Sequence, residues 1–127
     1  MVDSSMGTFR VDCTVRNYAE PEKQALVRDL LVDTGSDSTW ISENTLTDLG
    51  IARQKKDLSF VMANGEIVTR SVGFAIIRID NHFTIDEVVF AQPGDLLLLG
   101  ARTLEGLDLR VDPRAKKLVA AGPRLAA

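Results

Sequence analysis

The sequence predicts an all-β protein of one domain with one or two short helices. Polar and apolar side chains alternate in several segments rich in β-branched and aromatic residues, which is the period of a half-buried strand. Turn-forming pairs such as Asn-Gly separate these segments at short intervals. The 127 residues, 45% of them hydrophobic, are enough for one buried core. We therefore expect a single domain over residues 1–127, with its ordered part at about 8–120.

The first two strands are predicted to form a hairpin. Residues 8–16 carry apolar side chains at every second position, and residues 24–32 end in a run of three apolar side chains. The segment 17–23 between them contains Pro21 and is predicted to be the turn. Cys13 belongs to the apolar face of the first strand, so we interpret it as a small core side chain rather than a reactive thiol.

A short helix is predicted from Ser42 to Leu49. Ser42 is a residue type that caps helix N-termini, and Leu46 and Leu49 would face the core. Gly50 would provide the left-handed residue that ends the helix.

Two hairpins follow in the middle of the chain. The first covers 58–69 with a two-residue turn at Asn64-Gly65, because this pair tolerates positive φ angles. The second consists of strands 72–79 and 83–90. His82 falls in the turn between these strands, and we interpret it as a solvated loop side chain.

The C-terminal part adds short elements and brings the expected total to eight or nine strands. These elements are a wholly apolar strand at 96–99, a helical turn at 103–107 interrupted by Gly106, and a last hairpin of strands 107–111 and 117–119. Residues 1–6 and 121–127 are predicted to be loose ends.

Composition excludes several classes of function. The chain has 15 basic and 18 acidic side chains, and its net charge of -3 argues against a nucleic-acid partner. No apolar run approaches the roughly 20 residues of a membrane helix, and the N-terminus lacks the pattern of a secretory signal, so we expect a soluble, cytoplasmic protein. One cysteine and one histidine do not make a usual zinc or copper site. We therefore expect no metal and no cofactor.

The most distinctive local feature is an acidic residue at the end of a buried strand. The apolar residues 30–32 lead directly into Asp33-Thr34-Gly35-Ser36. A carboxylate withdrawn from water needs hydrogen-bond donors, and the amides of a glycine turn can supply them. Gly35 also lets a second backbone or a substrate approach closely. Taken alone, the same pattern fits an ordinary Asx turn after a strand.

In its longer context the sequence resembles the retropepsin-type aspartic proteases. The resemblance is carried by Leu31-Val32-Asp33-Thr34-Gly35-Ser36, by the following Ser38-Thr39-Trp40-Ile41, and by Leu98-Leu99-Gly100 before a short helix. The resemblance extends over residues 8–110. In the segment 93–113 the sequence is more similar to small stand-alone bacterial members of the family. It implies the retropepsin-like fold, a single closed, barrel-like lobe.

The resemblance implies an aspartic endopeptidase that acts as a homodimer on peptide or protein substrates. In this chemistry one ionised carboxylate takes a proton from water, while a neutral one donates a hydrogen bond to the scissile carbonyl. Only Asp33 has the required setting, so the second carboxylate must come from another copy of the chain across a two-fold axis.

The resemblance also assigns roles to particular residues. Asp33, Thr34 and Gly35 would form the catalytic motif, with Thr34 joining the two loops across the axis. The hairpin 58–69 would close over the substrate as a flap. The residues expected to bind substrate are Ser36, Asp37, Trp40, Met62, Ala63, Asn64, Gly65 and Leu98. Apolar subsites are expected from Trp40, Ile41, Val61, Met62 and Leu97, although Trp40 is equally well explained by core packing.

The sequence also departs from the family pattern, notably at an arginine, and two alternatives remain open at this point. The family's arginine directly follows Leu-Leu-Gly and braces the second acid, Asp37, whereas here Ala101 intervenes and Arg102 stands one position later. The first alternative is a dimeric binding or assembly module of the same fold with weak or no catalytic activity. The second is a monomeric β-domain whose Asp33 merely forms an Asx turn.

Overall fold

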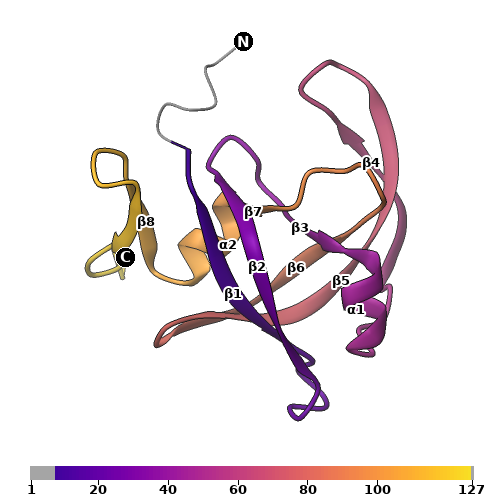
Figure 1. The fold of residues 1–127 in the computed structure, drawn as a ribbon, viewed down its shortest axis with the longest axis horizontal. Coiled ribbons are helices and arrows are strands. Elements are labelled where there is room, and N and C mark those ends of the chain that lie inside the picture. The colour runs from indigo at the N-terminus through magenta and orange to yellow at the C-terminus, as the bar shows by residue number, and fades with distance from the viewer. Residues whose placement is uncertain (1–7, 127) are drawn as a thin grey trace.

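The protein, seen in a computed structural model that describes residues 8–126, is built mainly from β-strands (Figure 1). The elements in order are β1 (Arg10–Arg16), β2 (Gln24–Asp33), β3 (Thr39–Ser42), α1 (Glu43–Asp48), β4 (Lys55–Val61), β5 (Ile67–Ile79), β6 (His82–Ala91), β7 (Leu98–Gly100), α2 (Ala101–Gly106), β8 (Leu109–Asp112) and β9 (Lys117–Ala120). The prediction of a mainly β fold with two short helices is confirmed.

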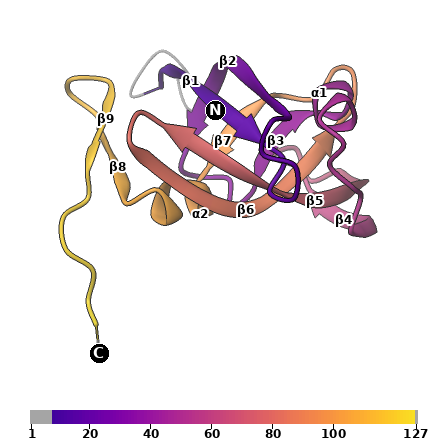
Figure 2. The ribbon, with the colours of Figure 1, turned by 90° about the horizontal axis from the view of Figure 1, so that it is seen from below.

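Seven strands form one sheet in the order β1-β2-β7-β3-β6-β5-β4. β1 also pairs with β5, so the first strand is bonded to strands near both ends of this order. β7 lies between β2 and β3, parallel to the former and antiparallel to the latter. β8 and β9 form a separate two-stranded sheet that projects from one side, as Figure 2 shows. This arrangement brings the end of β2 next to the end of β7.

The main core lies inside this curved sheet and includes the two helices. Its fully buried side chains include Val15, Leu30, Ile41, Leu46, Ile77, Phe90, Leu99 and Leu107. Cys13 belongs to the same cluster at 2% exposure, so its interpretation as a core side chain is confirmed. Burial, and secondly the charge of Asp12, raises the pKa of the Cys13 thiol to about 12.

The first helix begins and ends close to the predicted positions, but its cap differs. Ser42 occupies the N-cap position, yet its side chain makes no capping hydrogen bond, so that prediction is wrong. Ser42 is also the last residue of β3, a strand that the sequence pattern did not reveal. Leu46 and Leu49 are buried, and Gly50 has φ 70°, as predicted.

The middle hairpin is longer than predicted, and its turn is of another type. β5 is a single strand of 13 residues rather than two strands. Gly65 N donates to Met62 O over 2.9 Å, and Met62 N donates to Glu66 O over 2.8 Å. Gly65 has a positive φ of 86° and Asn64 has not. The loop therefore has three residues, 63–65, in which a type I turn is followed by a left-handed glycine.

The next turn corrects the interpretation of His82. The loop consists of residues 80 and 81 only, with Asp80 at φ 52°, and His82 pairs with Ile79 as the first residue of β6. The imidazole is half-buried, and its Nδ1 lies 2.9 Å from the carbonyl oxygen of Leu107. His82 is therefore a structural side chain between β6 and the segment after α2, not a solvated loop residue.

The C-terminal elements are shifted by a few residues from their predicted positions. α2 begins at Ala101, and Gly106 ends this helix rather than interrupting it. A Cβ at Gly106 would lie 2.4 Å from the Thr84 hydroxyl, which explains the glycine. β8 starts at Leu109, two residues later than expected.

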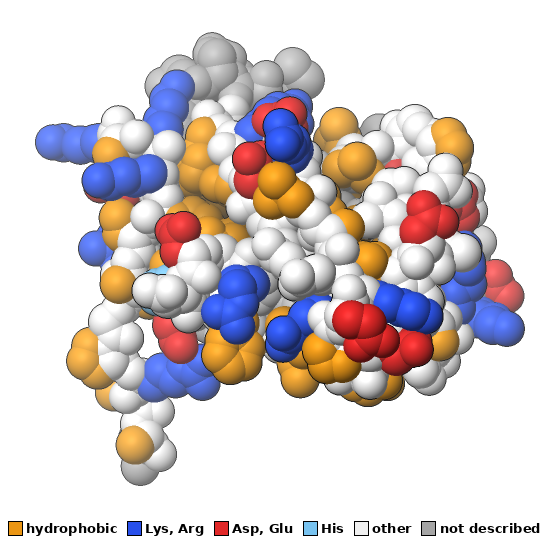
Figure 3. All heavy atoms as spheres, turned by 60° about the horizontal axis from the view of Figure 1, so that its bottom comes forward, with side chains coloured by type: hydrophobic (Ala, Val, Ile, Leu, Met, Phe, Trp, Pro, Cys, Tyr) orange, Lys and Arg blue, Asp and Glu red, His pale blue; other side chains and the backbone are white. Residues whose placement is uncertain are grey.

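The chain ends are only partly covered by the structure. The prediction for residues 1–6 lies outside the described part. Residues 121–126 have no regular structure, but they are not wholly loose, because Ala121 N donates to the Asp108 carbonyl and Arg124 pairs with the Asp108 carboxylate. On the face in Figure 3, basic and acidic side chains are interspersed with apolar ones. Within residues 8–126, no helix has the length and apolar character needed to cross a membrane.

Candidate active site

Asp33 lies at the end of β2, beside Gly100 at the end of β7. Its half-buried carboxylate accepts a hydrogen bond through Oδ1 from Gly35 N at 2.9 Å. Ser36 N donates to the Asp33 carbonyl at 3.2 Å, which closes the turn. Asp33 Oδ2 makes no hydrogen bond within the described chain. The glycine turn thus orients the carboxylate and leaves one of its oxygens available.

Backbone hydrogen bonds join this loop to the start of α2. Ala101 N donates to Ser36 O at 2.7 Å, and Arg102 N donates to Asp37 O at 3.1 Å. A Cβ at Gly100 would lie 2.3 Å from Ser38 O, so no other residue fits there without displacing the loop. The Asp-Thr-Gly and Leu-Leu-Gly segments are therefore parts of one rigid unit, although they are far apart in the sequence.

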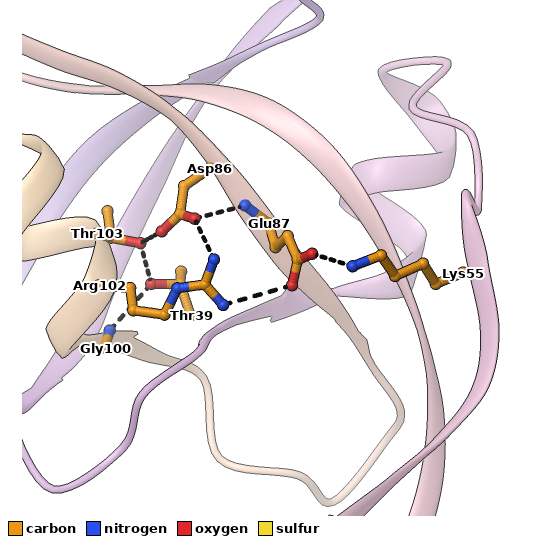
Figure 4. A network of polar contacts seen from close by, with 7 residues as sticks. All are labelled: Thr39, Lys55, Asp86, Glu87, Gly100, Arg102 and Thr103. Atoms are coloured by element: carbon orange, nitrogen blue, oxygen red, sulfur yellow. Dashed lines mark hydrogen bonds and ion pairs between the residues drawn. The ribbon is translucent and has the colours of Figure 1, made fainter.

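A chain of hydrogen bonds lies beneath this unit, as Figure 4 shows. Gly100 N donates to Thr39 Oγ1 at 2.9 Å, the Thr39 and Thr103 hydroxyls are 2.6 Å apart, and Thr103 donates to Asp86 Oδ2 at 2.8 Å. A carboxylate only accepts, so Thr103 gives its proton to Asp86 and must accept that of Thr39. Both threonines are 0% exposed. Neither they nor Asp86 were predicted as part of the site.

Arg102 does not brace Asp37 through its side chain. Its guanidinium lies 3.8 Å from Asp86 Oδ1 and 3.6 Å from Glu87 Oε2, and Glu87 also pairs with Lys55 (Figure 4). The exposed Asp37 carboxylate makes no hydrogen bond or ion pair with any residue in 8–126. Arg102, which stands one position later than the arginine of the family, therefore pairs with Asp86 and Glu87 rather than with Asp37.

A cleft of about 590 Å³ lies in front of Asp33. Its lining residues are Asp33, Gly35, Ser36, Asp37, Ser38, Trp40, Ser59, Phe60, Val61, Met62, Ala63, Leu96, Leu98 and Arg102. The structure therefore brings together most of the residues predicted for the site. Sequence reasoning missed Ser38, Ser59, Phe60, Leu96 and Arg102 as lining residues.

Several predicted site residues lie elsewhere. Thr34, Asn64 and Gly65 are exposed and do not line this cleft. Ile41 is fully buried in the core, and Leu97 lines a smaller pocket behind β3, so the expectation that either forms a subsite here is wrong. The Thr34 hydroxyl has no hydrogen-bond partner within residues 8–126.

Trp40 both packs in an apolar cluster and lines the cleft, which are the two interpretations that the sequence left open. It is 6% exposed and packs with Val72, Val89 and Leu98 in a second apolar cluster. Its ring also lies edge-on to Phe60 at a centroid distance of 5.2 Å, and both rings line the cleft. The aromatic contact thus connects the floor of the cleft to β4.

The described residues contain no group of three or more histidine, cysteine or acidic side chains that could hold a metal ion.

A comparison with known families identifies the family to which the chain belongs. A family model described as "gag-polyprotein putative aspartyl protease" matches residues 26–106. This span begins in β2 and ends with α2, so it includes both segments of the unit around Asp33 and Gly100. A comparison with curated proteins finds no match.

Proposed function

Because the chain belongs to the retropepsin-like aspartyl protease family, we propose that it is an aspartic endopeptidase that acts as a homodimer. Each copy contributes one Asp33 to a site on the two-fold axis. One carboxylate, ionised, takes a proton from water, and the other, neutral, donates a hydrogen bond to the scissile carbonyl. Water attacks directly, so no acyl-enzyme accumulates.

The observation that carries this proposal is the carboxylate of Asp33 at a cleft large enough for side chains of a peptide. One of its oxygens is fixed by Gly35 N, and the other has no partner in the described chain. The exposed Thr34 hydroxyl also lacks a partner, which fits a hydrogen bond across the axis to a second copy. Two identical loops would thereby be aligned with their carboxyl groups adjacent.

The remaining residues have roles in binding. Gly35 and the free Asp37 carboxylate would hold the substrate main chain, while Trp40, Met62 and Leu98 would contact its side chains. Asn64 and Gly65, at the tip of the β4–β5 hairpin, would approach the substrate only when the hairpin closes. The pairing of β1 with both β2 and β5 supports the closed, barrel-like lobe of this fold.

The test compares the wild type with Asp33→Asn on an unfolded protein substrate between pH 4 and 7. The wild type should cleave the substrate, Asp33→Asn should not, and Asp48→Asn, an exposed aspartate at the end of α1, should behave as the wild type. In mixtures with excess Asp33→Asn, activity should fall as the square of the wild-type fraction, because a mixed dimer has only one functional carboxylate.

Two results would overturn the proposal. A linear fall of activity in the mixtures would mean that one chain suffices. Equal cleavage by the wild type and Asp33→Asn, or no cleavage by either, would instead favour the dimeric binding or assembly module. Sedimentation at tens of micromolar distinguishes both from a monomeric β-domain.

A further inference from the structure

A well-formed ion pair connects the β4–β5 hairpin to the loop between β6 and β7. Arg70 Nε and one terminal nitrogen donate to the two carboxylate oxygens of Asp95, each at 2.8 Å. The remaining nitrogen donates to the Thr69 carbonyl at 2.8 Å. The two side chains are 13% and 11% exposed. Bidentate geometry and low exposure distinguish this pair from ordinary surface salt bridges, which contribute little.

Asp95 also shapes its own loop. Its backbone N–H donates to Gln92 O at 3.0 Å, and its Oδ2 accepts from Gln92 N at 2.8 Å. Gly94, at the third position of this turn, has φ 92° after Pro93, as in a type II turn. The hydrogen bond from Arg70, together with that from Gln92, lowers the pKa of the Asp95 carboxyl. The carboxylate therefore fixes the turn and binds the hairpin at the same time.

The pair stands where the hairpin leaves the sheet. β5 pairs with β6 from Val72 onward, whereas residues 67–70 pair with β4 alone. Within the described chain, the Arg70–Asp95 pair is the one hydrogen-bonded link between residues 58–70 and a segment outside the β4–β5 hairpin. Figure 1 shows the hairpin extending past the other strands at the upper right. This link therefore holds the hairpin to the loop between β6 and β7, in addition to the apolar packing of Phe60 on Trp40.

Leu96, the next residue, lines the cleft together with Phe60 and Met62 of the hairpin, and it is 63% exposed. The following residue, Leu97, accepts a hydrogen bond from Leu31 N at 3.2 Å, so Leu96 lies between two fixed points. An exposed leucine held in this way presents its side chain to whatever enters the cleft.

We infer that Arg70 and Asp95 are a positioning pair, which keeps the hairpin arm and Leu96 at the separation that accepts an apolar substrate side chain. This role rests on the proposed function. Neither Arg70 nor Asp95 lines the cleft, so the pair acts on substrate binding through the residues that do, and not on the chemical step. Its loss frees the hairpin arm and Leu96, and substrate must then restore their separation.

The test uses Asp95→Asn, with Asp108→Asn as the matched control. Asp108 also pairs with an arginine, but it lies after α2 and does not line the cleft. With an apolar peptide substrate, Asp95→Asn should raise KM about three- to tenfold while kcat changes less than about twofold. Arg70→Lys, which keeps the charge but not the paired geometry, should give a smaller increase in KM.

Trp40 supplies a second readout that needs no activity. It is the single tryptophan of the chain and packs on Phe60 of the hairpin. Acrylamide should therefore quench its fluorescence more strongly in Asp95→Asn than in the wild type or Asp108→Asn. If Asp95→Asn does not fold, both measurements are made on Arg70→Lys.

The outcomes separate this inference from the proposed function. An unchanged KM, or a fall in kcat alone, refutes the positioning role, as does quenching equal to that of the control. If the wild type cleaves nothing, the proposed function fails, but the quenching comparison still decides whether the pair sets the position of the hairpin.

Discussion

The buried chain of hydroxyl groups next to the Asp33 loop predicts how much Thr103→Val lowers the free energy of unfolding. Valine keeps the shape of threonine but removes the group that donates to Asp86 and accepts from Thr39. Gly100 N stays bonded to Thr39, so the change interrupts the chain in its middle. Because Thr103 is 0% exposed, water does not replace the lost partners.

The magnitude follows from the two groups that each lose one hydrogen bond, the Thr39 hydroxyl and the Asp86 carboxylate. An orphaned buried polar group costs about 1–3 kcal/mol. The Thr39 hydroxyl is fully buried and bears this cost, whereas Asp86 keeps a hydrogen bond from Glu87 N and its ion pair with Arg102. We expect a net loss of about 2–3 kcal/mol, a large part of the roughly 5–15 kcal/mol of a typical domain.

Urea unfolding at one fixed protein concentration measures this loss, since a dimer's stability depends on concentration. The midpoint should fall by about 1–2 M. Thr47→Val, at an exposed helix position with no side-chain hydrogen bond, serves as the control and should change little. In a double-mutant cycle, Thr39→Val and Thr103→Val together should cost about 1 kcal/mol less than their sum. The proposed hydrogen bonds would be refuted if the stability losses of Thr39→Val and Thr103→Val were additive in the double variant. They would also be refuted if Thr103→Val lost no more stability than Thr47→Val.

Three further predictions concern other parts of the fold. Gly100→Ala should lower stability by about 1–3 kcal/mol or more in thermal unfolding, because its Cβ would lie 2.3 Å from Ser38 O; an unchanged Tm would contradict this. Cys13, with its thiol pKa raised to about 12 by burial, should react with a thiol reagent near pH 8 far more slowly in the native than in the urea-unfolded protein; equal rates would count against its burial. The pKa of Asp95 is lowered by Arg70, so its stabilisation is present at neutral pH and is lost as pH falls below the ordinary value of 3.8. The stability difference between wild type and Asp95→Asn should therefore shrink below about pH 4, and a constant difference would disprove this.

The sequence predicts those elements whose signal is local. β1 lies close to its predicted bounds because its side chains alternate between buried and more exposed positions. β6 does so because it is a run rich in β-branched and aromatic residues. The residues of the loop at Asp33 were identified for a similar reason, since the acid, the hydroxyl and the glycine are consecutive. Gly65 was correctly placed in a turn because its φ of 86° is unfavourable for other residues.

Features that depend on distant residues were not predictable in this way. β3 has three consecutive buried residues and so shows no alternation, because both of its faces are covered: Ile41 packs in the main core and Trp40 in the second apolar cluster. The Thr39–Thr103 contact joins residues 64 positions apart. Hydrogen bonds of this kind depend on the crossing of strands, and nothing in either local sequence indicates them.

The position of Arg102 shows how a shift by one residue changes the ion pairs that an arginine makes at such a site. Successive residues of an α-helix differ by about 100° around its axis, so an arginine one place late points to a different side. Here that side holds Asp86 and Glu87 of β6. Only the Arg102 N–H reaches the loop, through the Asp37 carbonyl. Because main-chain bonds at Ser36 and Asp37 hold the loop, its position does not depend on an arginine side chain, and the Asp37 carboxylate makes no hydrogen bond or ion pair within residues 8–126.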